Sequence, residues 1–267
     1  AEAATQFQAQ AFNELLPASG PVRTVVMGKD STSKNQQASR VRQFMNYYIT
    51  SVMEEYTPDM DQMLFYLPLA GSTFKKTYFD ETLGRAVSKF VPAENLVVPY
   101  ETSDLETCPN ITQVVRMSLN DLRKRQIGGT YLDVEVIPAQ KELSDLEGEM
   151  DRIEGLEPNQ IDYDCTILEC HVDLDLEGYE ELDTDGEPTG IKVPYVVTLS
   201  EDNGQVLSIR RNYQEDDELK RKIQYFTHFK FLPGFGFYGL GLIHTIGGLS
   251  RTATAALRQL IDAGTLS

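Results

Sequence analysis

Apolar side chains recur every three or four residues in several stretches of the chain, which is the spacing of amphipathic helices. The clearest stretch lies between residues 41 and 56, and we expect its aromatic-rich stripe to face the protein interior. The stripe consists of Val41, Phe44, Met45, Tyr48, Ile49, Val52, Met53 and Tyr56. The same spacing predicts helices over residues 5–16, which Pro17 ends, and over residues 59–71, which Gly71 ends.

Two further helices are predicted in the second half of the chain. One begins after Ser118, which is a typical N-cap residue with Asp121 three positions later, and the double glycine at 128–129 ends it. The other begins near His244 and leads to Gly264, a good residue for a helix C-terminus. Its apolar face consists of Leu249, Ala253, Ala256, Leu257, Leu260 and Ile261.

Apolar and polar residues alternate elsewhere, as they do in half-buried strands. The segments concerned are Val22–Met27, 74–92 (two strands with a turn at Glu81–Gly84), 94–100, 130–138, 166–182, 192–213 (a hairpin with Asn203-Gly204 in its loop) and 221–233. We expect the strands after Asp162 to form one antiparallel meander that ends near Pro233. In the first of these strands, Ile167, Glu169, His171, Asp173 and Asp175 share one face. The acids alternate with apolar residues as on the outer face of a strand, and His171 is expected to be a core or surface histidine.

These elements predict an α+β fold in which helices pack on an antiparallel sheet. We expect three parts along the chain. Residues 1–132 form an N-terminal helical and β part, and residues 133–162 form an acidic helix or linker. Residues 163–267 contain the β-meander, a glycine-rich loop and the C-terminal helix.

The charge of the chain is strongly uneven. The formal net charge is −17, of which residues 1–100 carry −1, residues 101–220 carry −20 and residues 221–267 carry +4. An acidic surface does not hold nucleic acid by its phosphates, because phosphate binding depends on Lys and Arg. The acidic region therefore indicates either simple solubility or a surface that repels DNA and lets it slide past. Charge alone does not separate these two interpretations.

The terminal sequences and the cysteine count exclude some classes of protein. No run of 18 apolar residues predicts a membrane span, and the first ten residues do not resemble a signal peptide. Both ends suggest cuts within a longer polypeptide. The three cysteines, Cys108, Cys165 and Cys170, are too few for a disulfide framework. His171 follows Cys170, but no second pair at zinc spacing exists, so buried thiols in a strand are expected.

Residues Gly234 to Gly239 match the G-x-G-x-x-G pattern of dinucleotide sites. In such sites the glycines turn a strand directly into a helix within a parallel βαβ unit. Here Pro233 precedes the motif, large aromatics lie within it, and the helix is expected to start well after it. We therefore interpret it as a tightly bent loop that lets main chain pack closely. An acidic enzyme with a cofactor at residues 234–241 is the alternative.

Other motifs are incomplete. The acidic run at Asp173, Asp175 and Glu177 resembles the start of an EF-hand loop, but its twelfth position is Thr184 instead of Glu. The turn at 183–186 could bind a divalent cation weakly, although a polar turn is the preferred interpretation. Residues 28–34 lack the ending of a Walker A loop. His228 and His244 flank the glycine-rich loop without a nucleophile to pair with. We assign no catalytic, cofactor-binding or metal-binding residue, and no cofactor.

Several segments together resemble portal proteins, the head-to-tail connectors of short-tailed and related tailed bacteriophages. The main segment is residues 220–267, which include FLPGFGFYGLGLIHTIGGL; the others, in the same order as in the family, are PVRTVVMGKD, ASRVRQFMNYYIT, LFYLPLAGSTFKKTYFDE, CPNITQVVRMSLNDLRKRQIGG and IKVPYVVTLSEDNGQVLSIRRNY. The signature residues are Pro233, Gly234, Gly236, Tyr238, Gly239, Gly241, His244, Gly247 and Gly248, and we expect their role to be structural. The resemblance covers almost the whole chain except the acidic stretch near residues 140–160.

This resemblance implies a structural protein of the virion. The chain is similar to a portal wing domain, and its C-terminal helix would lead toward a stem, with the stem, clip and crown lying beyond Ser267. Portal subunits assemble with themselves into a closed ring, usually a dodecamer, at one capsid vertex after assembly in the host cytoplasm. Double-stranded DNA passes non-specifically through that ring during packaging and ejection. The implied partners are the terminase motor, mainly through regions absent from this chain, and capsid, scaffolding and tail or adaptor proteins, with no membrane.

Overall fold

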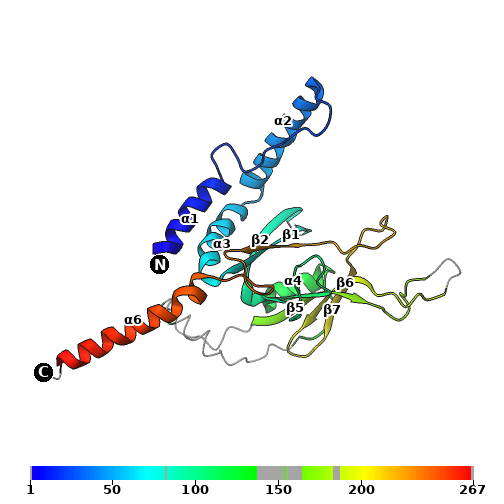
Figure 1. The fold of residues 1–267 in the computed structure, drawn as a ribbon. Helices are drawn as coiled ribbons and strands as arrows, with labels where there is room; N and C mark the ends of the chain where they lie inside the picture. The colour runs from blue at the N-terminus through cyan, green and yellow to red at the C-terminus, as the bar shows by residue number, and fades with distance from the viewer. Residues whose placement is uncertain are drawn as a thin grey trace. The chain divides into compact units, whose positions relative to one another are not determined.

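The computed structural model describes residues 2–81, 83–136, 152, 155, 164–182 and 187–265, and it has the expected α+β fold (Figure 1). The helices are α1 (Glu2–Leu15), α2 (Thr32–Tyr47), the π-helix η1 (Tyr48–Val52), α3 (Tyr56–Ala70), the 3₁₀-helix η2 (Ala93–Asn95), α4 (Leu119–Ile127) and α6 (Leu242–Thr265). The strands are β1 (Ser72–Asp80), β2 (Arg85–Pro92), β3 (Leu96–Val97), β4 (Asn110–Ser118), β5 (Asp164–Leu174), β6 (Val193–Ser200), β7 (Val206–Arg211) and β8 (Phe226–Lys230).

The chain forms two compact units, and each contains one antiparallel sheet. The first unit comprises Ala1–Glu94, Glu101–Glu106 and Gln224–Ser267, and the second comprises Asn95–Tyr100 and Thr107–Ile223. This division differs from the expected boundaries at residues 132 and 162. The reason is that the C-terminal segment returns to pair with the N-terminal part of the chain, which order along the sequence does not reveal.

The sheet of the first unit has the strand order β2-β1-β8. The hairpin of β1 and β2 is confirmed, with Thr73 opposite Pro92 and Asp80 opposite Arg85. The strand predicted near residues 221–233 also exists as β8. Its expected place in a meander with the preceding hairpin is wrong, because β8 pairs with β1, with Ser72 opposite Lys230. The alternation of side chains identified the strand but carried no information about its partner.

The sheet of the second unit has the strand order β3-β4-β5-β6-β7, and the β6–β7 hairpin is confirmed. Apolar clusters lie on both faces of β5. Ile167 packs in a cluster with Met117 and Leu122, while the opposite face packs against Tyr195 and its neighbours. His171, which was expected to be either a core or a surface histidine, is a core residue and is only 2% exposed.

Helices α1 and α3 contribute to an apolar cluster in the first unit. Met60, Met63 and Leu64 are buried in α3, and Phe7 and Phe12 of α1 pack against them. Both helices match their predicted positions. At the end of α3, Gly71 adopts φ +86° as the left-handed C-cap, which is why the chain can turn directly into β1. The predicted N-cap of α4 is also confirmed, since Ser118 Oγ accepts a hydrogen bond from Asp121 N–H over 3.1 Å.

The apolar stripe of residues 41–56 is divided among three elements instead of forming one helix. The α-helix ends at Tyr47, and η1 continues with a bond from Met53 N–H to Tyr48 O over 2.9 Å. Met53 is buried, but Val41 and Phe44 are exposed, and α2 buries none of its residues within the described chain. The prediction of a buried aromatic face is therefore wrong for α2. Periodicity shows which side of a helix is apolar and not whether a neighbour covers it.

Two predicted strands are not strands. Residues Val22–Met27 belong to no helix, strand or turn and form no ladder with another described segment. Within 130–138, the described residues up to Val136 are irregular, although Leu132 N–H donates to Leu207 O over 2.7 Å. Both segments have the composition of strands, but neither has a neighbouring strand with which it forms a hydrogen-bonded ladder among the described residues. The expected acidic helix or linker at 133–162, apart from residues 133–136, 152 and 155, and the turn at 183–186 lie outside the described residues.

Candidate functional site

The glycine-rich loop between β8 and α6 folds back on itself. An isolated bridge joins Leu232 to Leu240, with Leu240 N–H donating to Leu232 O over 2.9 Å. Three of the loop's glycines allow this geometry, because a Cβ atom at each would overlap main-chain atoms of the loop or of residues 69–71. These glycines are Gly234, Gly239 and Gly241. The geometry agrees with the interpretation of a tightly bent loop.

The N–H groups at the end of this loop are already bound within the chain. Gly239 N–H donates to Ser72 Oγ over 2.7 Å, and Gly241 N–H donates to His244 Nδ1 over 3.1 Å. The N–H of Leu240 closes the bridge described above. A dinucleotide site needs such groups to be free to point at phosphate oxygens. The conformation of the loop thus argues against a phosphate cradle at residues 239–241.

An aromatic stack joins the loop to the sheet. The His228 ring lies 4.5 Å from Phe74 and 4.7 Å from Phe237, measured between ring centroids. His228 Nε2 also lies 3.0 Å from Ser72 Oγ. Burial, followed by the charge of Lys230, lowers the pKa of His228 to about 4. His228 is therefore a neutral packing residue at pH 7, and it does not meet His244, whose ring caps the start of α6.

The signature residues divide into two groups in the structure. Gly234, Gly239, Gly241, Tyr238 and His244 take part in the loop contacts and its packing. At Gly236 and Gly248 an added Cβ would meet nothing within 4 Å, and at Gly247 it would meet only a side chain of its own helix at 3.9 Å. Within the described chain, neither close contact with neighbouring atoms nor a positive φ angle requires glycine at these three positions. Pro233 precedes the bent segment as predicted.

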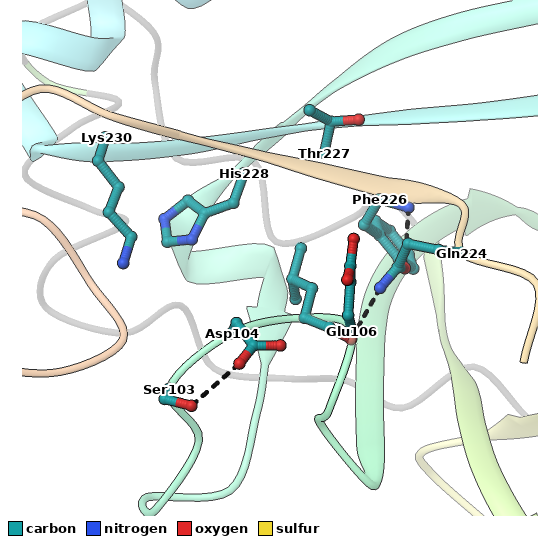
Figure 2. Close-up of a pocket in the computed structure, with 9 residues that line it drawn as sticks. Ser103, Asp104, Glu106, Gln224, Phe226, Thr227, His228 and Lys230 are labelled. Carbon is teal, nitrogen blue, oxygen red and sulfur yellow. Dashed lines mark hydrogen bonds between the residues drawn. The ribbon is translucent and has the colours of Figure 1, made fainter.

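An open groove with a volume of about 370 Å³ runs beside β8 (Figure 2). The strand forms one side of the groove through Phe226, Thr227, His228 and Lys230, and the loop of residues 103–106 forms the other. Gln224 Nε2 donates to Leu105 O over 2.7 Å and ties the two sides together. The loop side carries two exposed carboxylates, Asp104 and Glu106. Sequence reasoning missed this groove, because the two segments are more than 100 residues apart.

The opposite edge of the same sheet is covered by side chains. Ala86, Ser88 and Phe90 of β2 direct their N–H groups away from β1, and each donates to a side-chain oxygen. The acceptors are Tyr48 Oη at 2.9 Å, Glu55 Oε1 at 3.2 Å and Asp59 Oδ2 at 2.8 Å, respectively. A regular set of acceptors on an edge strand keeps other strands from pairing there. We refer to this arrangement as the capped edge.

Burial and neighbouring groups shift the pKa values of Glu55 and Lys75 near the capped edge. Burial alone would raise the pKa of Glu55, but hydrogen bonds from its own backbone, from Arg85 and from Ser88 lower it overall. The Arg85 guanidinium lies 2.7 Å from Glu55 Oε2. Burial lowers the pKa of Lys75 to about 8, although Asp59 and Glu55 act in the opposite direction. Lys75 is 4% exposed, and its Nζ lies 4.2 Å from the Tyr56 ring centroid.

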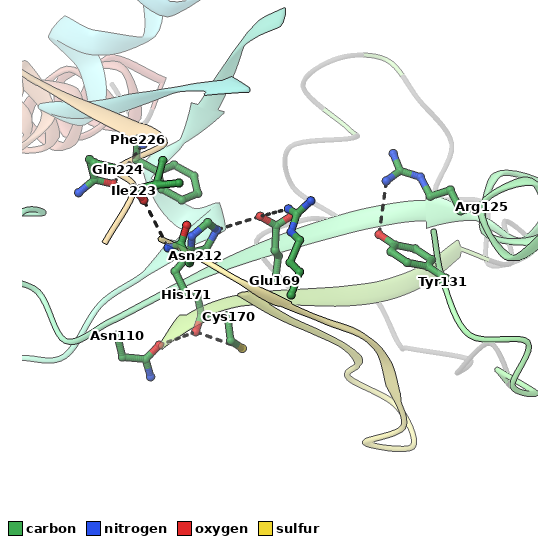
Figure 3. A network of polar contacts seen from close by, with 12 residues as sticks. Asn110, Arg125, Tyr131, Glu169, Cys170, His171, Asn212, Ile223, Gln224 and Phe226 are labelled. Atoms are coloured by element: carbon green, nitrogen blue, oxygen red, sulfur yellow. Dashed lines mark hydrogen bonds and ion pairs between the residues drawn. The ribbon is translucent and has the colours of Figure 1, made fainter. Parts of the chain in front are cut away.

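The second unit contains a buried polar group around His171 (Figure 3). His171 Nε2 lies 2.8 Å from Glu169 Oε1, and Arg210 lies 3.8 Å from the same oxygen. Asn212 is fully buried, and its side-chain nitrogen donates to Ile223 O over 3.3 Å. Arg210 of β7 and Glu169 of β5 thus form an ion pair, while Asn212 joins the end of β7 to the segment at Ile223. We interpret this arrangement as a structural network.

The described residues contain no group of three or more His, Cys, Asp or Glu side chains placed to hold a metal ion. Cys108 and Cys165 are buried free thiols and Cys170 is partly buried, which agrees with the expectation of buried thiols. Among the described helices, none has the length and apolarity that a bilayer crossing requires. No known family profile matches the chain, and no curated protein sequence matches it.

Proposed function

We propose that this chain is the wing part of a viral portal subunit, which forms a ring at the capsid vertex. The ring would conduct DNA during packaging and ejection and would join head to tail. The first support for this proposal is the ordered set of segments that resemble portal proteins. It carries no chemical motif, so its weight comes from the number and order of the segments.

The structural observation that carries the proposal is α6. This 24-residue helix follows the glycine-rich loop directly and leaves its large apolar side chains exposed by 51–74%. These side chains are Ile243, Ile246, Leu249, Leu257, Leu260 and Ile261. A stripe of this size is typical of a helix that packs against other chains. Neighbouring subunits of a ring would cover it.

The charge distribution also supports the proposal. The second unit has 27 acidic and 12 basic residues, a net charge of −15, whereas the first unit has a net charge of −2. In a ring, any part of this acidic surface that faced the channel would repel phosphate and let DNA move with little friction. The ring itself, the terminase motor, the capsid and tail proteins and the virion location are all parts of the proposal.

The test is end-on electron microscopy of the protein expressed with whatever sequence naturally flanks it. The proposal expects closed rings with a central hole. A particle that stays monomeric at high concentration would refute it. Titration of the protein with nucleotides distinguishes the portal proposal from the alternative of an enzyme with a cofactor at residues 234–241. The portal proposal expects no saturable binding, whereas a cofactor site would bind and would lose affinity when Gly239 is replaced.

A further inference from the structure

The outer edge of β8 offers main-chain groups to a further strand. Phe231 N–H donates to Gly71 O over 3.0 Å, and Thr77 N–H donates to Tyr225 O over 2.9 Å. The main-chain N–H and C=O groups of the odd-numbered residues of β8 therefore point toward β1. Those of the even-numbered residues point away from the sheet. Phe226 N–H is bound by Gln224 Oε1 at 3.2 Å. Within the described ranges, the main-chain groups of His228 and Lys230 have no hydrogen-bond partner.

The groove described above lies along this open edge. Its lining includes both His228 and Lys230, and the loop Ser103–Glu106 stands opposite them (Figure 2). A strand added to β8 would therefore lie between the edge and two carboxylates. Such strand addition gains affinity from main-chain hydrogen bonds and specificity from the side chains next to the new strand. The acidic side of the groove favours a strand that carries basic residues.

The chain itself contains a segment without a ladder, Val22–Met27 in the first unit, whose sequence predicts a strand. It is rich in β-branched residues, and its side chains alternate between partly covered and exposed, with Val25 82% and Met27 87% exposed. Asn46 binds both main-chain groups of Val22, and Thr24 Oγ1 donates to Ala38 O over 3.0 Å. Across the residues that the structure describes, the main-chain groups of residues 23–27 have no partner.

We infer that residues 22–27 of one copy add as a strand to the β8 edge of a second copy. Six extended residues span about 20 Å, and the five residues of β8 span about 17 Å, so the lengths agree. Arg23 on the donor, with Lys29 two residues beyond its end, is opposite in charge to Asp104 and Glu106 on the acceptor. The two surfaces are unlike, which is what a head-to-tail ring contact requires. This inference rests on the proposed ring and names one of its contacts.

The test uses a labelled peptide of residues 20–30 and, as receptor, the chain with the substitution Val25→Pro, whose own donor strand cannot pair. Fluorescence anisotropy is expected to show saturable binding, which a scrambled peptide lacks. N-methylation of residues 23, 25 and 27, or instead of 22, 24 and 26, blocks one set of N–H groups. Only one of these two patterns is expected to weaken binding, by about tenfold or more, because one set faces β8 and the other faces away.

Reversing the two carboxylate charges of the groove tests whether the peptide binds beside β8. The double substitution Asp104→Lys and Glu106→Lys in the receptor is expected to weaken binding by about tenfold, whereas Glu14→Lys on α1 leaves it unchanged. All three positions are exposed, and unchanged melting temperatures will show that the variants fold. Absence of saturable binding, or equal effects of both methylation patterns, overturns the inference. Rings by microscopy without peptide binding refute this contact alone, while peptide binding without rings refutes the proposed ring.

Discussion

The two edges of the first sheet differ in how their main-chain groups are satisfied. On the capped edge, three successive outward N–H groups of β2 meet Tyr48, Glu55 and Asp59, which come from one short stretch of chain. On the β8 edge, His228 and Lys230 offer the equivalent groups beside an open groove. An edge that must not pair is usually protected, as β2 is. The unprotected edge is thus the side on which assembly is chemically possible.

The capped edge also places a cation in the interior. Lys75 lies on the central strand, with Asp59 and Glu55 close enough to favour its charged form. Asp59 therefore has two tasks: it accepts the Phe90 N–H and it partly balances a buried lysine. Next to the open edge, Lys76 of β1 is also buried, and its Nζ lies 5.6 Å from the ring centroid of Phe226 of β8. Side-chain hydrogen bonds cover the capped edge, whereas aromatic packing around His228 lies beside the open edge.

The largest effect is expected where the open edge continues into the glycine-rich loop. The substitution Gly241→Ala would place a Cβ atom on the Leu69 carbonyl and 2.6 Å from Gly71 N. Main chain cannot move aside easily, so we expect a loss of about 3 kcal/mol in the free energy of unfolding. Gly236→Ala is the matched control, since nothing lies within 4 Å of the added atom. Denaturant unfolding measures both, and equal losses would show that the loop is not closely packed.

The next largest effect is expected from opening the capped edge. Asp59→Ala leaves the Phe90 N–H without its acceptor and removes a counter-charge of Lys75, so we expect a loss of about 2 kcal/mol in the free energy of unfolding. Gln62→Ala, at an exposed position of the same helix, should change it by less than about 0.5 kcal/mol. Denaturant unfolding of both variants measures the difference. If Asp59→Ala matches this control, the cap does not contribute to stability.

Elements set by local sequence were predicted well. Gly71 ended α3, Ser118 capped α4, and the Asn203-Gly204 loop joined β6 to β7. What failed depended on partners far along the chain. The period of residues 226–230 is the same whether the strand pairs with β7 or with β1. For the same reason Val22–Met27 has the composition of a strand but no ladder within the described residues.

The candidate site was predicted only in its loop. The aromatics and Pro233 indicated a packed bend, and the overlaps at Gly234, Gly239 and Gly241 agree with that interpretation. The capped edge was missed, although Glu55 and Asp59 are four residues apart and so lie on one helical face. That spacing alone does not say that an edge strand lies opposite. The groove beside β8 depends on two segments whose contact no local pattern encodes.

The smallest effect is expected from pH, and it distinguishes the open edge from the capped one. The pKa of His228 is about 4 in the folded protein and about 6.5 in an unfolded chain, so between these values the unfolded state binds more protons. Stability therefore falls as the pH drops from about 6.5 to about 4. Allowing for the part of the ring that solvent screens, we expect His228 to contribute about 1 kcal/mol to this fall.

The contribution is isolated by comparing His228→Gln with the unchanged chain in unfolding experiments at pH 4 to 7. Gln does not titrate, so the difference in unfolding free energy between the two proteins should change with pH inside this window and become constant above pH 7. His244, which caps α6, provides a second control through His244→Gln. Acid sensitivity that survives the removal of His228 would instead come from carboxylates such as Glu55, whose lowered pKa makes their protonation destabilising. In that case protonation at the capped edge, and not at the open edge, would cause the loss of stability in acid.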